Sequence, residues 1–267
     1  MDREQISRSD LKKNFLKEII MRFDFQGVLQ AEMESVLLVV KPFLKEKMFN
    51  RYEERTASHM DDNDSAMELK EQVVYSFTSE ASGYIVELSN TNVVLIVQSQ
   101  MYSSFDDYAS IFCRIVAIYN EKIDFFTPKR FGLRKINYCF IKNKEDITKY
   151  FNSRFYNYDT LIENYESQKV ERVDRLSDGE SNINLRYLIE EGEIDGQKYY
   201  KVVLDSDIYM MNQDVISRIV LDEEEIKVIN EKLFVIYLNA VTDDFLGILI
   251  SDEEISSDGI LGVELNE

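Results

Sequence analysis

The chain has few of the residues that most often build catalytic and metal sites. Its 267 residues include one histidine, two cysteines and no tryptophan. A single histidine, His59, argues against multi-histidine metal sites and Cys–His pairs, and no GxSxG motif accompanies it for a hydrolase triad. Cys113 and Cys139 form no CxxC motif and predict two reduced thiols. We therefore expect no metal, no cofactor and no catalytic residue of these classes.

Phosphate-binding and targeting motifs are also missing. Neither GxxxxGK[ST] nor GxGxxG occurs in the sequence, which argues against the nucleotide-binding folds that use those loops. The N-terminal segment is charged and lacks an apolar stretch, and no apolar run approaches the ~18 residues that a membrane helix needs. The sequence predicts a cytoplasmic protein without a secretory signal or membrane span.

Negative charge is what the chain has in abundance. Fifty Asp and Glu residues against 31 Lys and Arg give a formal net charge of −19. This charge repels nucleic-acid phosphates and anionic membranes, and it favours a basic protein partner; a homo-oligomer is left open. Acidic clusters such as Asp61, Asp62 and Asp64 keep a metal-dependent hydrolase as an alternative. In a chain so rich in acids such clusters arise by chance, and a solvated surface is the favoured explanation of them.

Hydrophobic periodicity predicts an α+β fold in which an antiparallel β-sheet is covered by helices. The predicted strands cover residues 15–25, 68–78, 84–89, 93–97, 129–142, 164–176, 183–194 and 197–205, and the predicted helices cover 28–48, 104–122, 143–152 and 222–241. Residues 50–66 are polar and aperiodic, which predicts a loop. Three strands followed by a helix occur at 68–122 and again at 164–241, which suggests an internal βββα duplication.

This order predicts three parts of the chain. Residues 1–152 form an N-terminal half, residues 153–241 form a second βββα half packed on the first, and residues 242–267 form an acidic C-terminal tail. The tail contains the apolar segment ILGVEL. Two interpretations of it are open: a solvated terminus, or a short strand-forming segment that docks on a partner or back onto the fold.

The most distinctive segment is RFGLRKIN, at residues 130–137. In a strand, Arg130, Gly132 and Arg134 share one face. Two arginines on either side of a glycine leave a gap that would admit a carboxylate, a phosphate or another backbone. The first two of these predict a ligand-binding site for a small anion such as a nucleotide signal. The alternative is that both arginines pair with neighbouring acidic residues.

RFGLRKIN resembles the R-x-G-L-R-Y-x-N signature of an uncharacterised, sporadically distributed bacterial and archaeal family. FLKEIIMRFDF, YSFTSEASGYIVELS and the spacing of Tyr102, Phe105, Tyr108 and Phe112 extend the resemblance over about residues 15–152. This chain has Lys135 where that family usually has an aromatic residue.

The patchy distribution of that family implies a place in bacterial conflict systems, such as phage defence, counter-defence or toxin–antitoxin loci. On this basis the chain is expected to be a non-enzymatic interaction component that binds a protein partner through its acidic surface. Its acidity, and a first strand followed by a crossover and a meander, also resemble the SecB-type export chaperones. That second resemblance implies a holdase chaperone as a further alternative.

Overall fold

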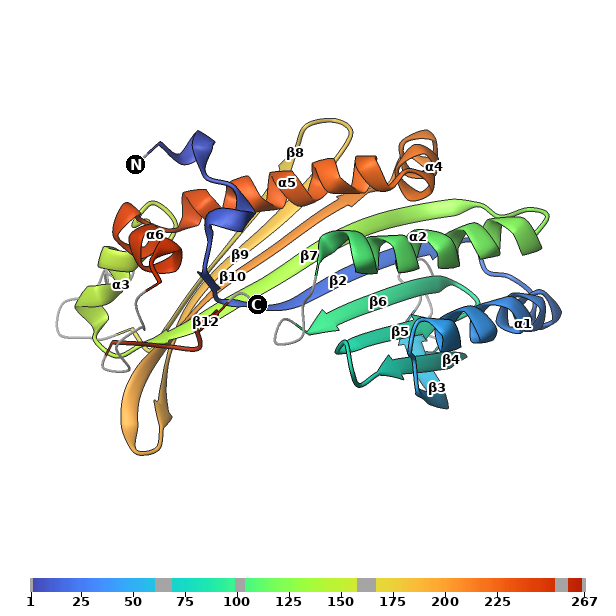
Figure 1. Ribbon diagram of the computed structural model, residues 1–267, viewed down its shortest axis with the longest axis horizontal. Coiled ribbons are helices and arrows are strands. Elements are labelled where there is room, and N and C mark those ends of the chain that lie inside the picture. The colour runs from blue at the N-terminus through green and yellow to red at the C-terminus, as the bar shows by residue number, and fades with distance from the viewer. Residues whose placement is uncertain (1, 61–68, 99–103, 158–166, 253–258, 266–267) are drawn as a thin grey trace. The chain divides into compact units, whose positions relative to one another are not determined.

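A computed structural model describes residues 2–60, 69–98, 104–157, 167–252 and 259–265 of the chain. It confirms an α+β fold in which helices pack on an antiparallel sheet (Figure 1). The strands are β1 (Lys13–Asn14), β2 (Leu16–Phe25), β3 (Arg51–Met60), β4 (Leu69–Ser79), β5 (Tyr84–Leu88), β6 (Asn92–Gln98), β7 (Pro128–Ile141), β8 (Lys169–Ser177), β9 (Asn182–Ile194), β10 (Gln197–Met210), β11 (Ile260–Leu261) and β12 (Glu264–Leu265). The helices are α1 (Gln30–Glu46), α2 (Phe105–Lys122), α3 (Lys144–Tyr150), α4 (Gln213–Leu221), α5 (Glu223–Ala240) and α6 (Asp243–Ile250), preceded by the short 3-10 helices η1 (Arg3–Gln5) and η2 (Arg8–Asp10).

The large sheet has the hydrogen-bonded strand order β3-β4-β5-β6-β2-β7-β10-β9-β8, and β11 pairs with β7. Strands β3 to β6 follow one another as a meander before α2, and β8 to β10 do the same before α4 and α5. Strands β4 to β6 before α2 and β8 to β10 before α4 and α5 match the three-strand order that the periodicity predicts, and β3 extends the first meander to four strands. Whether the two halves arose by duplication stays a prediction.

The chain forms two compact units, and each gathers segments that are distant in the sequence. The first unit contains residues 1–19, 134–208 and 228–267, and the second contains residues 20–133 and 209–227. Strands β2, β7 and β10 and helix α5 contribute residues to both units. The sequence-based boundaries at 152 and 241 follow the order of elements along the chain, and they stay a prediction.

Helix α2 supplies much of the core of the second unit. The side chains that the 3.6-residue period places on one face are buried, and Phe112 contacts the ring of Phe131 on β7 at a centroid distance of 5.9 Å. The buried hydroxyl of Tyr119 donates to the carbonyl oxygen of Ser89 at 3.2 Å. The helix is capped by Ser104, which accepts the N–H of Asp107 at 3.2 Å. The sequence also predicts an apolar face on α1, which includes Leu29 at its start. Leu29 precedes the helix and is 73% exposed, whereas the other members of that face are buried, namely Met33, Val36, Leu37, Val40 and Leu44.

Aromatic residues from distant segments form the core of the first unit. Phe15 is fully buried, and its ring stacks on Tyr237 of α5 at 4.9 Å and on Phe245 of α6 at 5.4 Å. Phe151 meets the same ring edge-on at 5.8 Å. This cluster ties the N-terminal strand, the segment after α3 and the last two helices together.

The loop predicted for residues 50–66 is wrong over its first part, because residues 51–60 form β3. This strand pairs with β4 along its whole length, from Arg51↔Thr78 to Met60↔Leu69. Being at the end of the strand order, it is held by backbone hydrogen bonds rather than by burial, and the side chains of residues 51–56 are exposed. An exposed strand needs no apolar alternation, so the periodicity misses it. Residues 61–66 lie outside the described part of the chain.

Of the two interpretations of residues 242–267, the structure favours docking back onto the fold. Helix α6 begins after Thr242, whose hydroxyl accepts the N–H of Phe245, and it buries Phe245, Leu246 and Leu249. Further along, β11 pairs with the end of β7 and β12 pairs with β1. The acidic residues of this segment therefore accompany an apolar face that packs in the first unit.

Candidate functional site

Arg130 and Gly132, the first two residues of the predicted anion site, lie on β7 in the second unit. The guanidinium of Arg130 lies over the ring of Tyr209 at 4.8 Å, and its Nη1 is 3.7 Å from a carboxylate oxygen of Asp24. A Cβ added at Gly132 would lie 3.1 Å from Nη2 of Arg130. The side chain of Arg130 therefore folds back over Gly132, and the space that the sequence predicts for a ligand holds the chain's own guanidinium.

Arg134, the third residue, lies on β7 in the first unit and forms a two-pronged ion pair with Asp205 of β10. Its Nε and Nη2 donate to the two carboxylate oxygens at 2.7 and 2.6 Å. The side chain of Asp205 is 8% exposed, whereas that of Arg134 is 42% exposed. Hydrogen bonds to Asp205 raise the pKa of the guanidinium above its usual value.

Both signature arginines thus contact carboxylates of the chain itself, which is the alternative that the sequence leaves open. The ligand-binding role of Arg130, Gly132 and Arg134 stays a prediction. At Arg134, an incoming anion would have to displace Asp205, a bidentate partner with charge-assisted hydrogen bonds.

Replacing Arg134 by alanine is expected to lower the free energy of unfolding by about 1–2 kcal/mol, because the buried carboxylate of Asp205 loses both donors. Water reaches part of this pair, so the loss stays below that of a fully buried pair. Urea titration of the two proteins measures the difference, and Arg134→Lys, which keeps the charge but not the fork, should fall between them. An unchanged urea midpoint for Arg134→Ala would show that the pair does not stabilise the fold.

Lys135, the next residue of the signature, points to the opposite face of the strand and is half-buried. Burial, assisted by the positive charge of Arg8, lowers its pKa to about 7, against a smaller opposing effect of Glu231. The first unit also contains Asn230, whose buried side-chain Oδ1 accepts no hydrogen bond from any residue that the structure describes. The sequence contains a signal for Lys135, since alternation places it on the same face as the apolar residues of β7.

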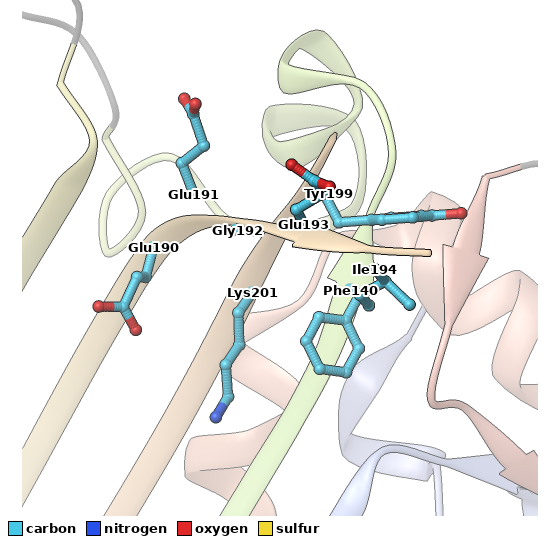
Figure 2. A pocket seen from close by; sticks show the side chains of 8 residues that line it. All are labelled: Phe140, Glu190, Glu191, Gly192, Glu193, Ile194, Tyr199 and Lys201. Carbon is cyan, nitrogen blue, oxygen red and sulfur yellow. The ribbon is translucent and has the colours of Figure 1, made fainter. Parts of the chain in front are cut away.

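A small pocket of about 150 Å³ lies beside the β9–β10 hairpin of the first unit (Figure 2). Its lining consists of Phe140, the run Glu190–Ile194, Tyr199 and Lys201. Figure 2 shows Glu190, Phe140 and Lys201 extending to one side of the β9 backbone and Glu191 to the other. Sequence reasoning missed this site, because β9 and β10 look like ordinary strands until their pairing brings these side chains together.

The charges around the pocket are only partly balanced. Glu191 pairs with Lys198 at 2.8 Å, and Glu190 lies 3.8 Å from the ammonium of Lys169. The ammonium of Lys201 is 4.4 Å from the ring centroid of Tyr138. Glu193 is exposed and forms no ion pair with any residue that the structure describes.

Metal binding and thiol chemistry are not favoured by the residues that the structure describes. No three His, Cys, Asp or Glu side chains there converge on a point that could hold a metal ion. Burial, then the charges of Glu223 and Asp222, raises the pKa of Cys113 to about 12. Burial also raises the pKa of Cys139 well above its usual value, so neither thiol ionises near neutral pH. The acids Asp61, Asp62 and Asp64 lie outside the described residues, as does the side chain of His59.

Comparison with known proteins leaves the chain without a family assignment. No family model and no curated protein matches the sequence. Within the described residues, no helix combines the length and the apolar character needed to cross a membrane.

Proposed function

We propose that this protein is a non-enzymatic interaction component that binds a basic protein partner through its acidic surface. The observation that carries the proposal is the pocket beside the β9–β10 hairpin, whose lining includes the ring of Phe140 and three glutamates, Glu190, Glu191 and Glu193, against a single lysine, Lys201. Its volume of about 150 Å³ suits the end of one side chain better than a whole metabolite.

The lining suits an arginine or lysine of the partner. Carboxylates accept charge-assisted hydrogen bonds from a guanidinium or ammonium group, and an aromatic ring packs against the methylene stem of such a side chain. The net charge of −19 extends this preference beyond the pocket, because it attracts a basic surface over about a Debye length before contact.

The biological setting of the proposal is a bacterial conflict system, and its support is the resemblance of residues 15–152 to the family with the RxGLRYxN signature. Phage plating on cells with and without the gene tests this setting. An efficiency of plating that does not change for any phage of a broad panel would count against it.

Replacing Glu190, Glu191 and Glu193 together by glutamine is expected to abolish partner binding while leaving the fold intact, because three accepting charges are lost and no apolar contact changes. The immobilised protein is exposed to a bacterial lysate at about 50 mM and about 500 mM salt, since salt screens contacts between exposed charges. Quantitative mass spectrometry should find proteins retained at low salt, released at high salt and missing from the triple variant.

The matched control replaces Glu223, Glu224 and Glu225 at the start of α5 by glutamine, which removes the same charge elsewhere. This control should retain the partner. Equal losses in both variants would show that net charge rather than the pocket attracts the partner, and no retention at either salt concentration would reject the proposal.

A further inference from the structure

Strand β8 is an exposed sheet edge. It stands at the end of the strand order, and within the described residues it pairs with β9 alone. Seven of its nine side chains are exposed, and two of these are large apolar ones, Val173 and Leu176, each with 52% exposure. An edge strand with free backbone groups can pair with another strand, and natural proteins usually prevent such pairing.

The β8–β9 ladder fixes which backbone groups of β8 point outward. The N–H of Glu191 donates to the carbonyl oxygen of Gln168 at 2.8 Å, and at the turn the N–H of Asp178 donates to the carbonyl oxygen of Ser181 at 3.1 Å. Hydrogen-bonded pairs alternate along an antiparallel ladder, so the even-numbered residues of β8 face β9. The odd-numbered residues, Lys169, Glu171, Val173, Arg175 and Ser177, therefore direct their N–H and C=O groups away from β9.

The sequence of β8, KVERVDRLS, is complementary to itself when it is read antiparallel about Val173. Centring a two-fold axis on Val173 places that residue opposite its own copy. Within residues 170–176, the other opposed pairs are Glu171 with Arg175, Arg172 with Asp174, and Val170 with Leu176. Each of these pairs joins opposite charges or two apolar side chains, which are the cross-strand combinations that stabilise a sheet.

The register that gives this complementarity also brings the outward-pointing N–H and C=O groups of the two β8 strands opposite each other. With Val173 at the centre, odd-numbered residues face odd-numbered residues, and these carry the outward-pointing groups. A shift of the axis by half a residue would oppose odd with even residues and leave the ladder without matching donors and acceptors.

We propose that two copies of this chain associate through antiparallel pairing of their β8 strands about a two-fold axis at Val173, which joins their sheets into one. A second copy fits better than a foreign strand because both the charges and the apolar residues of β8 match their own reversal. The strand carries three basic and two acidic residues, so it is a place where two chains of net charge −19 can approach with little repulsion.

Hydrogen bonds and an ion pair fix the turn of the β8–β9 hairpin, so β8 is already extended for this pairing. Asp178 at its turn accepts hydrogen bonds from the N–H of Glu180 at 3.0 Å and from the N–H of Ser181 at 2.6 Å. Lys232 of α5 lies 3.2 Å from the same carboxylate and attaches the turn to the helix. Arg175 forms no ion pair in the described part of the chain, whereas Glu171 already pairs with Arg186 at 2.6 Å and has accepting capacity left.

Two charge reversals test the inference by sedimentation velocity. Glu171→Arg and Arg175→Glu each place like charges opposite each other twice in a homodimer, so each variant is expected to weaken self-association about tenfold or more. In an equal mixture, the arginine introduced at position 171 of one copy would face the glutamate introduced at position 175 of the other, while the remaining pair keeps the wild-type charges. Mixing should therefore restore a heterodimer with an affinity close to that of the wild type.

Glu180→Arg and Arg218→Glu make the same charge changes outside the strand, at exposed positions, and should leave association unchanged. Val173→Pro removes an outward N–H that the β8–β9 ladder does not use, so it should abolish the dimer while the melting temperature stays close to that of the parent. A wild-type protein that remains monomeric at about 100 μM, well above the Kd of a stable dimer, would overturn the inference. Dimers unaffected by either reversal, or reversals that mixing does not rescue, would do so as well.

Discussion

Phe112→Asp is expected to leave the protein unfolded or aggregated under conditions in which the parent is folded. Phe112 is fully buried on α2 and packs on Phe131. The substitution removes a large apolar side chain, which alone costs about 3–5 kcal/mol, and it adds an unpaired buried carboxylate. The sum approaches the whole free energy of unfolding of an ordinary domain. Far-UV circular dichroism and a thermal melt measure the result.

Asn120→Asp is the matched control, because it adds the same carboxylate to an exposed position of the same helix. It should change the free energy of unfolding by a few tenths of a kcal/mol at most, through the charge near the helix C-terminus. If Phe112→Asp melted like this control, the helix would not bury the face assigned to it.

Lys135→Met is expected to stabilise the protein by about 1–3 kcal/mol near pH 6, since a buried ammonium gives way to an apolar side chain of similar length. The folded-state pKa of Lys135 is lowered to about 7, from 10.5 in its ordinary environment. Between these two values the unfolded chain holds a proton that the folded chain has released, so the wild type gains stability as pH rises through this window. Below about pH 7 both states are charged, and the full penalty of burying the ammonium is present.

Urea unfolding at pH 6 and pH 9 checks this expectation. The difference between Lys135→Met and the parent should be larger at pH 6 than at pH 9. Lys142→Met, at an exposed position just after β7, should show no such dependence on pH. A constant difference between Lys135→Met and the parent at both pH values would show that Lys135 keeps an ordinary pKa in the fold.

Periodicity predicts the elements that bury one face, and it fails for the others. The apolar faces of α1 and α2 can be predicted from the sequence because their burial imposes a 3.6-residue repeat. Strand β3 cannot be predicted in this way, because its exposed side chains carry no such repeat. The two units are also hidden from the sequence, since the first joins residues 1–19 to residues 134–208 and the second joins residues 20–133 to residues 209–227, and contacts of such long range leave no mark on local patterns.

For the candidate sites, too, the sequence predicts some features and misses others. Alternation along β7 correctly places Arg130, Gly132 and Arg134 on one face of the strand, but it cannot show that Arg130 folds over the glycine or that Asp205 pairs with Arg134. Those contacts depend on rotamers and on neighbouring strands. By contrast, the self-complementarity of β8 lies within seven consecutive residues, 170–176, and it becomes meaningful once β8 is known to lie at an edge.

The pairing of β1 with β12 has a consequence for how the chain matures on the ribosome. Lys13 pairs with Leu265, and nearby Phe15 packs against Tyr237 and Phe245. During synthesis Phe15 emerges early, but its neighbours in the finished core are made more than 200 residues later, after about ten seconds or more of translation. During that time the apolar N-terminal segment is exposed to solvent without its native contacts. Nascent chains of this protein should therefore depend on chaperone protection more than its modest size suggests.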